Sequence, residues 1–338
     1  MSLSLRSAKD EMSDMAAVAM RSTTWRDYLE MCKPRVVLLM LLCALVGMML
    51  ATPGWVDPVV LIAGLIGIAL VAASAAVVNH IADAHIDARM GRTQNRPMAA
   101  GRMPFARAAM FSAGTGIAGM AILVAFVNPL TAWLNLVSWV GYGLVYTLYL
   151  KRATPQNIVI GGIFGAAPPL FGWAAVSNSI EPGALLLVLI IFTWTPPHFW
   201  ALALDRKEEY AKADVPMLPV THGEQHTKWQ ILFYTLLMVA VTLLPFVIRM
   251  SGWLYLVSAI ALGAGFVYWA VQLLVGKNPR APIETFRYSI LYLGLLFAAL
   301  LIDHYVDPFM PASMSTSAPA ATPAATPASA PLQLTHST

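Results

Sequence analysis

The stretch VVLIAGLIGIALVAASAAVVNHIADAHIDARM, from Val59 to Met90, decides the fold class of this chain. Its first 20 residues, Val59 to Val78, carry no charge. A helix needs about 20 apolar residues to cross a bilayer. The run then ends directly in Asn, His and Asp residues. The stretch therefore predicts a membrane-spanning helix whose last turns carry polar side chains to the membrane boundary.

The composition extends this prediction to the whole chain. Of 338 residues, 58% are hydrophobic and only 11% are charged, whereas soluble domains contain about 25% charged residues. The mean hydropathy of +0.67 agrees. The net charge of +4 does not indicate nucleic-acid binding. The spacing of Cys32 and Cys43 favours neither a zinc site nor a disulfide framework. We expect an all-α, polytopic membrane protein.

Nine segments are long and apolar enough to span a membrane. They cover residues 36–53, 59–79, 107–127, 131–150, 156–176, 184–204, 229–248, 252–275 and 288–306. The fifth contains the pair Pro168 and Pro169, and the sixth contains Pro196 and Pro197. Prolines at membrane depth are tolerated where neighbouring protein satisfies the freed backbone groups. Both pairs are therefore expected to disturb their helices and to face the protein interior.

The basic residues predict the orientation of these nine helices. Of the 21 Lys and Arg residues, 20 precede the first segment or lie in every second connection after it, and only Arg249 falls on the other side. Cytoplasmic loops carry the excess of Lys and Arg. This places the N-terminus in the cytoplasm and the C-terminus outside. Residues 1–32 form a cytoplasmic segment, 33–307 the membrane domain, and 308–338 an Ala/Pro/Ser/Thr-rich tail predicted to be disordered.

The first cluster of candidate site residues follows the run quoted above. Asn79, Asp83 and Asp87 are spaced i, i+4, i+8, which places them along one face of a helix. Carboxylate and amide oxygens suit Mg²⁺. Arg92 and Arg96 follow one turn apart and suit phosphate. The cluster indicates a site for a magnesium–phosphate complex. The alternative is a solvated helix end in which Asp and Arg pair with each other.

A second cluster repeats this pattern at the end of the sixth segment. Asp205 and Glu209 are spaced i, i+4, and Tyr210 and Lys212 follow. Two acid pairs at the same membrane face indicate an internal pseudo-repeat, with a site between its halves. Converging carboxylates repel one another, so metal ions and basic residues are expected there. The repetition favours a site over a solvated loop.

Two further places carry candidate residues. Lys151, Arg152 and Asn157 follow the fourth segment and supply charge for a diphosphate, unless they only anchor the chain by the positive-inside rule. His198 lies in apolar surroundings beside the Pro196–Pro197 break. It is either a residue that binds a ligand or transfers protons, or a hydrogen-bonded packing histidine.

Taken together, these motifs resemble the UbiA superfamily of intramembrane prenyltransferases. Within it they are most similar to the haem branch, the protohaem IX farnesyltransferases or haem O synthases. The matching pieces are the Asn79–Asp83–Asp87 face, KPRV (33–36), MGRTQNRP (90–97), YTLYLKRATPQNIVIGG (146–162), GAAPPLFGW (165–173), TPPHFWALAL (195–204) and EYAKADVPMLPV (209–220). Two positions depart from the pattern, with His85 where many relatives have Asp and Glu209 where Asp is common.

The resemblance implies a nine-helix bundle with a cytoplasm-facing central cavity in a bacterial inner membrane. It implies transfer of a farnesyl group from farnesyl diphosphate to a vinyl group of haem B, giving haem O for haem A and terminal-oxidase cofactor biosynthesis, with a downstream haem-modifying enzyme as a partner. The expected Mg²⁺ ligands are Asn79, Asp83, Asp87, Asp205 and Glu209. The expected catalytic residues are Asp83, Asp87, Arg92, Arg96 and Lys151, and the substrate-binding residues are Asn79, Arg152, Asn157, His198, Tyr210 and Lys212.

Two other functions compete with this one. A related enzyme would prenylate a quinone precursor or another aromatic acceptor by the same chemistry. A transporter or haem-handling scaffold would also contain broken helices and buried polar residues. The second alternative does not explain two acid pairs with arginines on one membrane face.

Overall fold

The computed structural model describes residues 23–306. Every element within that range is helical, which confirms the all-α class. The predicted tail, 308–338, and residues 1–22 of the predicted cytoplasmic segment lie outside the described residues.

Each of the nine predicted segments lies on one helix or on two consecutive helices. They correspond to α3 (Pro34–Leu50), α4 (Pro58–Asp87), α5 (Phe105–Phe126), α6 (Pro129–Trp139) with η1 (Val140–Leu150), α8 (Asn157–Ala166) with α9 (Pro168–Ser177), α10 (Pro182–Asp205), α13 (Glu224–Val247), α14 (Trp253–Val275) and α15 (Ala281–Val306). Four short helices complete the described chain, namely α2 (Trp25–Met31), α7 (Lys151–Ala153), α11 (Lys207–Lys212) and α12 (Leu218–Thr221).

Seven of these helices are long and apolar enough to cross a membrane, with α8 and α9 counted as one. An eighth span results if α2 and α3, which meet at an angle of 51°, are counted as one. α6 and η1 follow each other without interruption, but the first is an α-helix and the second a π-helix. The structure thus confirms a multi-pass helical membrane protein, and the number of nine spans stays a prediction.

Proline and short polar side chains define where several helices begin. Proline occupies the first turn of α3, α4, α6, α9 and α10, where its missing N–H has no helical partner in any case. Asp57 caps α4 by accepting from the backbone N–H of Val59 at 2.7 Å. Asn128 likewise caps α6 by accepting from Thr131 N at 2.8 Å. These caps satisfy N–H groups that the helix itself leaves open.

The two proline pairs behave differently, although all four rings are buried as expected. Pro168 and Pro169 begin α9 directly after the break at Ala167. Pro196 and Pro197 lie within α10, which continues to Asp205 without a break. The disturbance expected in the sixth segment is therefore limited to the two missing N–H donors, because the surrounding helices hold α10 in place.

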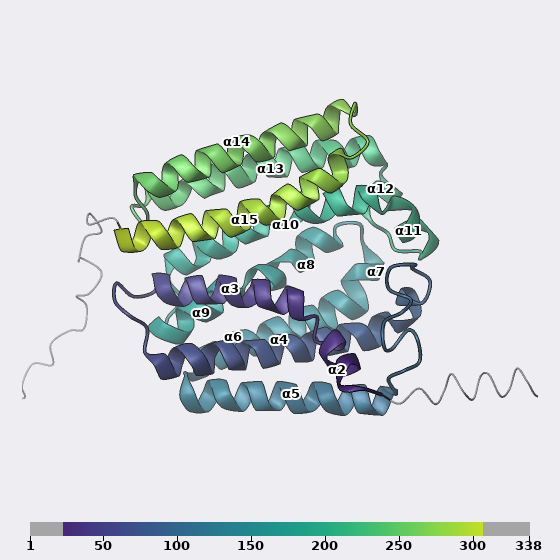
Figure 1. Ribbon diagram of the computed structural model, residues 1–338, viewed down its shortest axis with the longest axis horizontal. Coiled ribbons are helices and arrows are strands. Elements are labelled where there is room, and N and C mark those ends of the chain that lie inside the picture. Colours follow the sequence, from purple (N-terminus) through teal and green to yellow (C-terminus); the bar gives the residue numbers. More distant parts are fainter. Residues whose placement is uncertain (1–22, 307–338) are drawn as a thin grey trace, which may run out of the picture.

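The long helices lie side by side in one bundle (Figure 1). α10 packs against α13, α15 and α8, while α4 packs against α5, and α3 against α9. In the most apolar stretch of α10, 67% of the residues are buried, compared with 17% in α5. α10 is therefore an interior helix, and α5 presents most of its apolar surface to lipid.

The close approach of α3 and α9 depends on two glycines. A Cβ on Gly172 would overlap the carbonyl oxygen of Ala44, and a Cβ on Gly47 would overlap that of Pro169. Small residues allow helix backbones to approach this closely in membranes. Only glycine fits at these two positions.

The polar connections gather at one end of the bundle. Figure 1 shows α7, α11, α12 and the loop after α4 at its right-hand end. Met90, from the loop after α4, belongs to the same hydrophobic cluster as Ala213, Val215 and Met217, which follow α11. The fold thus brings the ends of α4 and α10 to one face of the molecule, as the pseudo-repeat predicted.

Candidate active site

The first acid motif is buried in the last turns of α4. Asn79, Asp83 and Asp87 are 4%, 2% and 4% exposed. Asn79 Nδ2 donates to Asp83 Oδ2 at 2.8 Å and lies 3.3 Å from the Thr147 hydroxyl of η1. The motif therefore forms the predicted polar face, and that face points into the protein.

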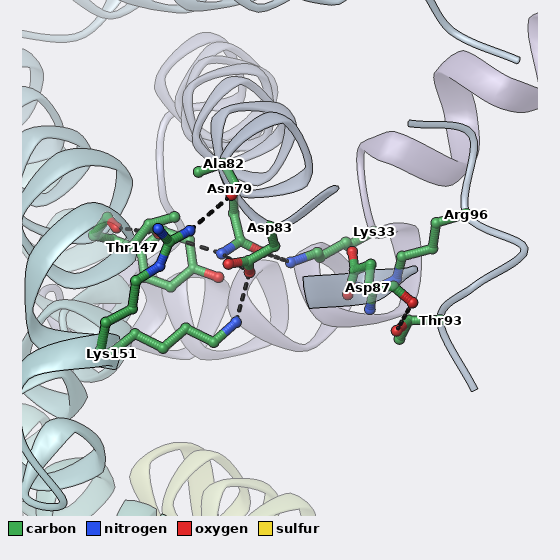
Figure 2. Close-up of polar contacts among 11 residues, drawn as sticks. Lys33, Asn79, Ala82, Asp83, Asp87, Thr93, Arg96, Thr147 and Lys151 are labelled. Carbon is green, nitrogen blue, oxygen red and sulfur yellow. Dashed lines mark hydrogen bonds and ion pairs between the residues drawn. The ribbon is translucent and has the colours of Figure 1, made fainter. Parts of the chain in front are cut away.

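Two lysines from other parts of the chain reach this face (Figure 2). Lys33 lies in the break between α2 and α3 in the left-handed conformation, with φ of 50°, and its ammonium group donates to Asn79 Oδ1. Lys151 Nζ lies 2.7 Å from Asp83 Oδ2. The other oxygen of Asp83, Oδ1, is buried and has no protein partner within residues 23–306. Asp83 thus keeps one oxygen available for a ligand.

Asp87 has a different partner. Arg96 Nη1 donates to its two oxygens at 2.9 and 2.8 Å, and the Thr93 hydroxyl donates to its backbone carbonyl at 3.1 Å. The loop after α4 therefore folds back over the helix end. The Asp–Arg pairing of the alternative interpretation is present, but Asp87 is buried rather than solvated.

The residues after η1 also contact α4. Arg152 Nη2 donates to the carbonyl of Ala82 at 2.9 Å, beside the Lys151–Asp83 pair. Asn157 is fully buried, and its Oδ1 has no protein partner in the described part of the chain. Lys151 and Arg152 are thus more than membrane anchors, because both contact the helix that carries the acid motif. The π-helix η1 delivers them, and π-helical turns occur often at functional sites.

The second acid motif is held by one arginine. Arg206 Nε lies 3.1 Å from Asp205 Oδ2, and Arg206 Nη1 donates to Glu209 Oε1 at 2.9 Å. Glu209 Oε2 is buried and lacks a protein partner within the described range. The structure places no cluster of three or more Asp, Glu, His or Cys side chains at metal-binding distance within residues 23–306. The five predicted metal ligands thus share one end of the bundle but do not converge on a point.

Tyr210 is under the electrostatic influence of both motifs. The charged groups that act on its phenol include Arg92 and Arg96 from the first motif and Arg206 and Glu209 from the second. Burial raises the pKa of Tyr210 above its usual value. The phenol therefore stays neutral and can donate a hydrogen bond to an anion.

Several cations near the motifs have no carboxylate partner in the structure. Arg92 and Lys212 are exposed, and no ion pair joins Lys33, Arg92, Arg152 or Lys212 to a described acidic residue. Asp83, Asp87, Asp205 and Glu209 are each paired with Lys151, Arg96 or Arg206. The surplus of positive charge favours an anionic ligand.

The remaining two positions lie apart from these motifs. His85 is exposed and contacts Arg89 at 2.9 Å, so it does not share the buried face of Asp83. His198 is 9% exposed and bonds to Ser289 of α15 at 2.6 Å, with no contact to either acid motif.

Sequence reasoning missed three residues of this site. Lys33 belongs to the KPRV motif but was given no role, and its contact with Asn79 spans 46 residues. Arg206 was not singled out, because it stands in the run of charged residues DRKEE (205–209). Thr147 carries no sequence signal, because a threonine in an apolar helix is usually a packing residue.

The donor set fits Mg²⁺. Three of the predicted site residues have a buried carboxylate or amide oxygen without a protein partner within residues 23–306, namely Asp83 Oδ1, Glu209 Oε2 and Asn157 Oδ1. Hard oxygen donors are what Mg²⁺ requires, and it keeps several positions for water and substrate phosphate. A magnesium–diphosphate complex would therefore need few protein ligands from the two motifs.

The chain is similar along most of its length to proteins of one family. The model of the UbiA prenyltransferase family matches residues 40–306. The chain is 58% identical over 298 residues to "Protoheme IX farnesyltransferase" of Saccharophagus degradans, covering 88% of this chain and 98% of that protein. It is 61% identical over 282 residues to "Protoheme IX farnesyltransferase 1" of Pseudomonas fluorescens, covering 83% and 94%.

Solved structures show the same fold at low identity. A digeranylgeranylglyceryl phosphate synthase superimposes with a TM-score of 0.71 at 20% identity, covering 83% of this chain and 98% of that one. A UbiA homologue from Archaeoglobus fulgidus, bound to GPP and Mg²⁺, superimposes with a TM-score of 0.57 at 16% identity, covering 81% and 99%. The family model and the curated relatives each span most of the chain, and the chain therefore belongs to the UbiA prenyltransferase family.

Proposed function

We propose that this chain transfers a farnesyl group from farnesyl diphosphate to a vinyl group of haem B, giving haem O and diphosphate. The buried Asp83, with one oxygen paired to Lys151 and the other free, carries the proposal for the prenyl donor. The curated relatives, named protoheme IX farnesyltransferase at 58–61% identity, support haem as the acceptor. Haem O would be an intermediate in the biosynthesis of haem A and of terminal-oxidase cofactors. A downstream haem-modifying enzyme would use it as a substrate.

The reaction places negative charge on the departing diphosphate. Asn79, Asp83, Asp87, Asp205 and Glu209 are the residues that would hold Mg²⁺, and the bound ion would supply neutralisation of that charge. The protein's own cations act beside it. Positively charged groups that point at the developing negative charge stabilise the transition state most strongly where the dielectric constant is low.

The paired cations have two possible partners in this scheme. Lys151, Arg96 and Arg206 now neutralise the carboxylates. With those carboxylates holding a metal, Lys151, Arg96 and Arg206 would be free to interact with the diphosphate. Arg92 and Lys212, which are exposed, reach the same anion from outside, and Arg152, Asn157 and Tyr210 position it.

The farnesyl cation must be kept from water until it meets the acceptor. We place the acceptor on the interior side of the acid motifs, in a central cavity of a nine-helix bundle that opens to the cytoplasm of a bacterial inner membrane. The described chain begins near one end of the bundle and finishes at the other (Figure 1), as an odd number of crossings requires. The partition of Lys and Arg supports a cytoplasmic N-terminus.

Two alternatives share parts of this site. A quinone precursor or another aromatic acceptor would use the same prenyl donor, since the fold alone does not fix the acceptor. A haem transporter or scaffold would need neither the free Asp83 oxygen nor the surplus of cations. The geometry of the donor site favours an enzyme over a transporter.

Mass spectrometry of the products tests the proposal. The full-length protein in lipid nanodiscs is given haem B, farnesyl diphosphate and Mg²⁺, and we expect haem O and diphosphate. Asp83→Asn should reduce the rate of formation of both products about a thousand-fold while the protein still inserts. His85→Ala, on the exposed side of the same helix, is the matched control and should retain activity. Absence of haem O with the unaltered protein would overturn the assignment, and prenylation of a quinone precursor instead would replace it.

A further inference from the structure

The ring of His198 is fixed by three contacts in the interior of the bundle. It stacks against Trp194, with ring centroids 4.2 Å apart, and against Phe286 of α15 at 4.7 Å. Its Nδ1 lies 2.6 Å from the Ser289 hydroxyl oxygen. Trp194 Nε1 also donates to the carbonyl of Ser289 at 2.8 Å, which ties the same two helices together. The plane of the imidazole and the direction of Nδ1 are thus both determined.

The Ser289 hydroxyl determines which ring nitrogen carries the proton. Its oxygen lies 2.6 Å from the carbonyl oxygen of Phe286. A carbonyl has no hydrogen, so the hydroxyl must donate its single proton there. The hydroxyl can then only accept at its other contact, and Nδ1 of His198 must be the donor. A neutral histidine protonated on Nδ1 has a lone pair on Nε2.

This lone pair has no partner in the described part of the chain. No hydrogen bond joins His198 Nε2 to any residue from 23 to 306. His198 Nε2 is not completely buried. Both ring nitrogens of His80, by contrast, are buried and have no partner within residues 23–306. His198 precedes Asp205 by seven residues, or about two turns of α10, so it lies on nearly the same face and about 10 Å deeper. An imidazole nitrogen without a hydrogen-bond partner in the described chain therefore lies beneath the second acid motif.

We propose that Nε2 of His198 binds the iron of haem B and that Ser289 is the positioning residue that selects the required tautomer. This inference rests on the proposed function, because it takes haem B as the acceptor. Histidine nitrogen is a common ligand of haem iron. A ligating histidine almost always donates its other N–H to an acceptor, which fixes its orientation and increases its basicity. Ser289 supplies that acceptor here.

The surroundings suit a flat apolar macrocycle. Phe199 meets the His198 ring edge-on, with ring centroids 5.1 Å apart, and is 41% exposed, so an accessible aromatic ring lies beside the imidazole. Binding the iron here would hold the porphyrin on the membrane side of the diphosphate. A vinyl group at its edge would then face the farnesyl carbon, about two helical turns from the acids.

Resonance Raman spectroscopy of the full-length protein in nanodiscs, loaded with ferrous haem B, tests the inference. The unaltered protein should show an iron–histidine stretching band. His198→Ala should lose it, and added imidazole should restore it. Ser289→Ala should retain the band at a lower frequency, because Nδ1–H loses its acceptor, whereas Ser289→Thr should keep the original frequency. His304→Ala removes a histidine whose Nε2 contacts the Thr52 carbonyl, and it should leave the band unchanged.

Each outcome decides between specific possibilities. An unchanged band in His198→Ala, or no such band in the unaltered protein, overturns the ligand assignment and leaves His198 as a packing or proton-accepting residue. An unshifted band in Ser289→Ala overturns the positioning role. The variants Ser289→Ala and Ser289→Thr together test whether the histidine binds the iron, even where His198→Ala fails to fold. Haem O formation without a band that depends on His198 refutes this inference alone, whereas absence of haem O with the unaltered protein refutes the proposed function.

Discussion

The two acid motifs occupy equivalent places in the chain but differ in burial. In the first, Asp83 and Asp87 are almost fully buried, and each has its own cation. In the second, Asp205 and Glu209 have side chains that are 28% exposed, and they share Arg206. A charge interaction in a buried site is screened far less than one at the surface. The first motif is therefore the pre-organised half of the site, and the second is the half that adjusts to the ligand.

The largest expected effect separates these two motifs directly. Asp83→Asn should lower kcat about a thousand-fold, because it removes a buried carboxylate that would hold Mg²⁺ against the departing diphosphate. Asp205→Asn should lower it about ten-fold, because solvent already screens that carboxylate. Initial rates of haem O formation at saturating Mg²⁺ measure both. Equal losses in the two variants would contradict the proposed difference between the motifs.

The next effect concerns the lysine that reaches the first motif from far away in the sequence. Lys33→Met should reduce kcat about ten- to a hundred-fold, because Asn79 loses its partner and the site loses one of its positive charges. Arg35→Met is the matched control, since it removes an exposed charge two positions along the chain. The measurement is the rate of diphosphate release. If both variants lose activity equally, Lys33 acts only through membrane anchoring.

The sequence was sufficient for the helices and for the polar face of α4. Uncharged runs of about 20 residues have few folded alternatives in a membrane, and the spacing of Asn79, Asp83 and Asp87 requires that they share one side of a helix. The burial of the two proline pairs also follows from backbone chemistry. These features depend on residues close together in the sequence, so they can be predicted from the sequence alone.

The partners of the acids could not be predicted in the same way. The Lys33–Asn79 contact depends on a left-handed residue between two helices, and the Lys151–Asp83 contact on how η1 packs against α4. Both are consequences of tertiary packing between segments far apart in the chain. The missing convergence of the five proposed metal ligands has a similar cause, because equal spacing along two helices does not set the distance between the helices.

A smaller effect is expected at the arginine that joins the second motif. Arg206→Gln should lower the Mg²⁺ concentration needed for half-maximal activity, because Asp205 and Glu209 no longer have a competing cation. It should also lower kcat about ten-fold, because a group that stabilises the diphosphate is lost. Lys207→Gln, which breaks only the neighbouring surface pair with Glu224, should change neither value. An unaltered Mg²⁺ dependence in Arg206→Gln would show that Arg206 does not compete with the metal.

The smallest effect is expected where the two motif loops touch at the surface. Arg89 and Asp214 form a pair at 3.3 Å, with side chains 48% and 83% exposed. Exposed pairs of this kind contribute little, because water and salt screen them. Arg89→Ala, Asp214→Ala and the double variant should each change kcat less than about two-fold, and the effects of the single changes should add. A strong non-additive effect would mean that this contact holds the two loops over the site, and the second motif would then be as pre-organised as the first.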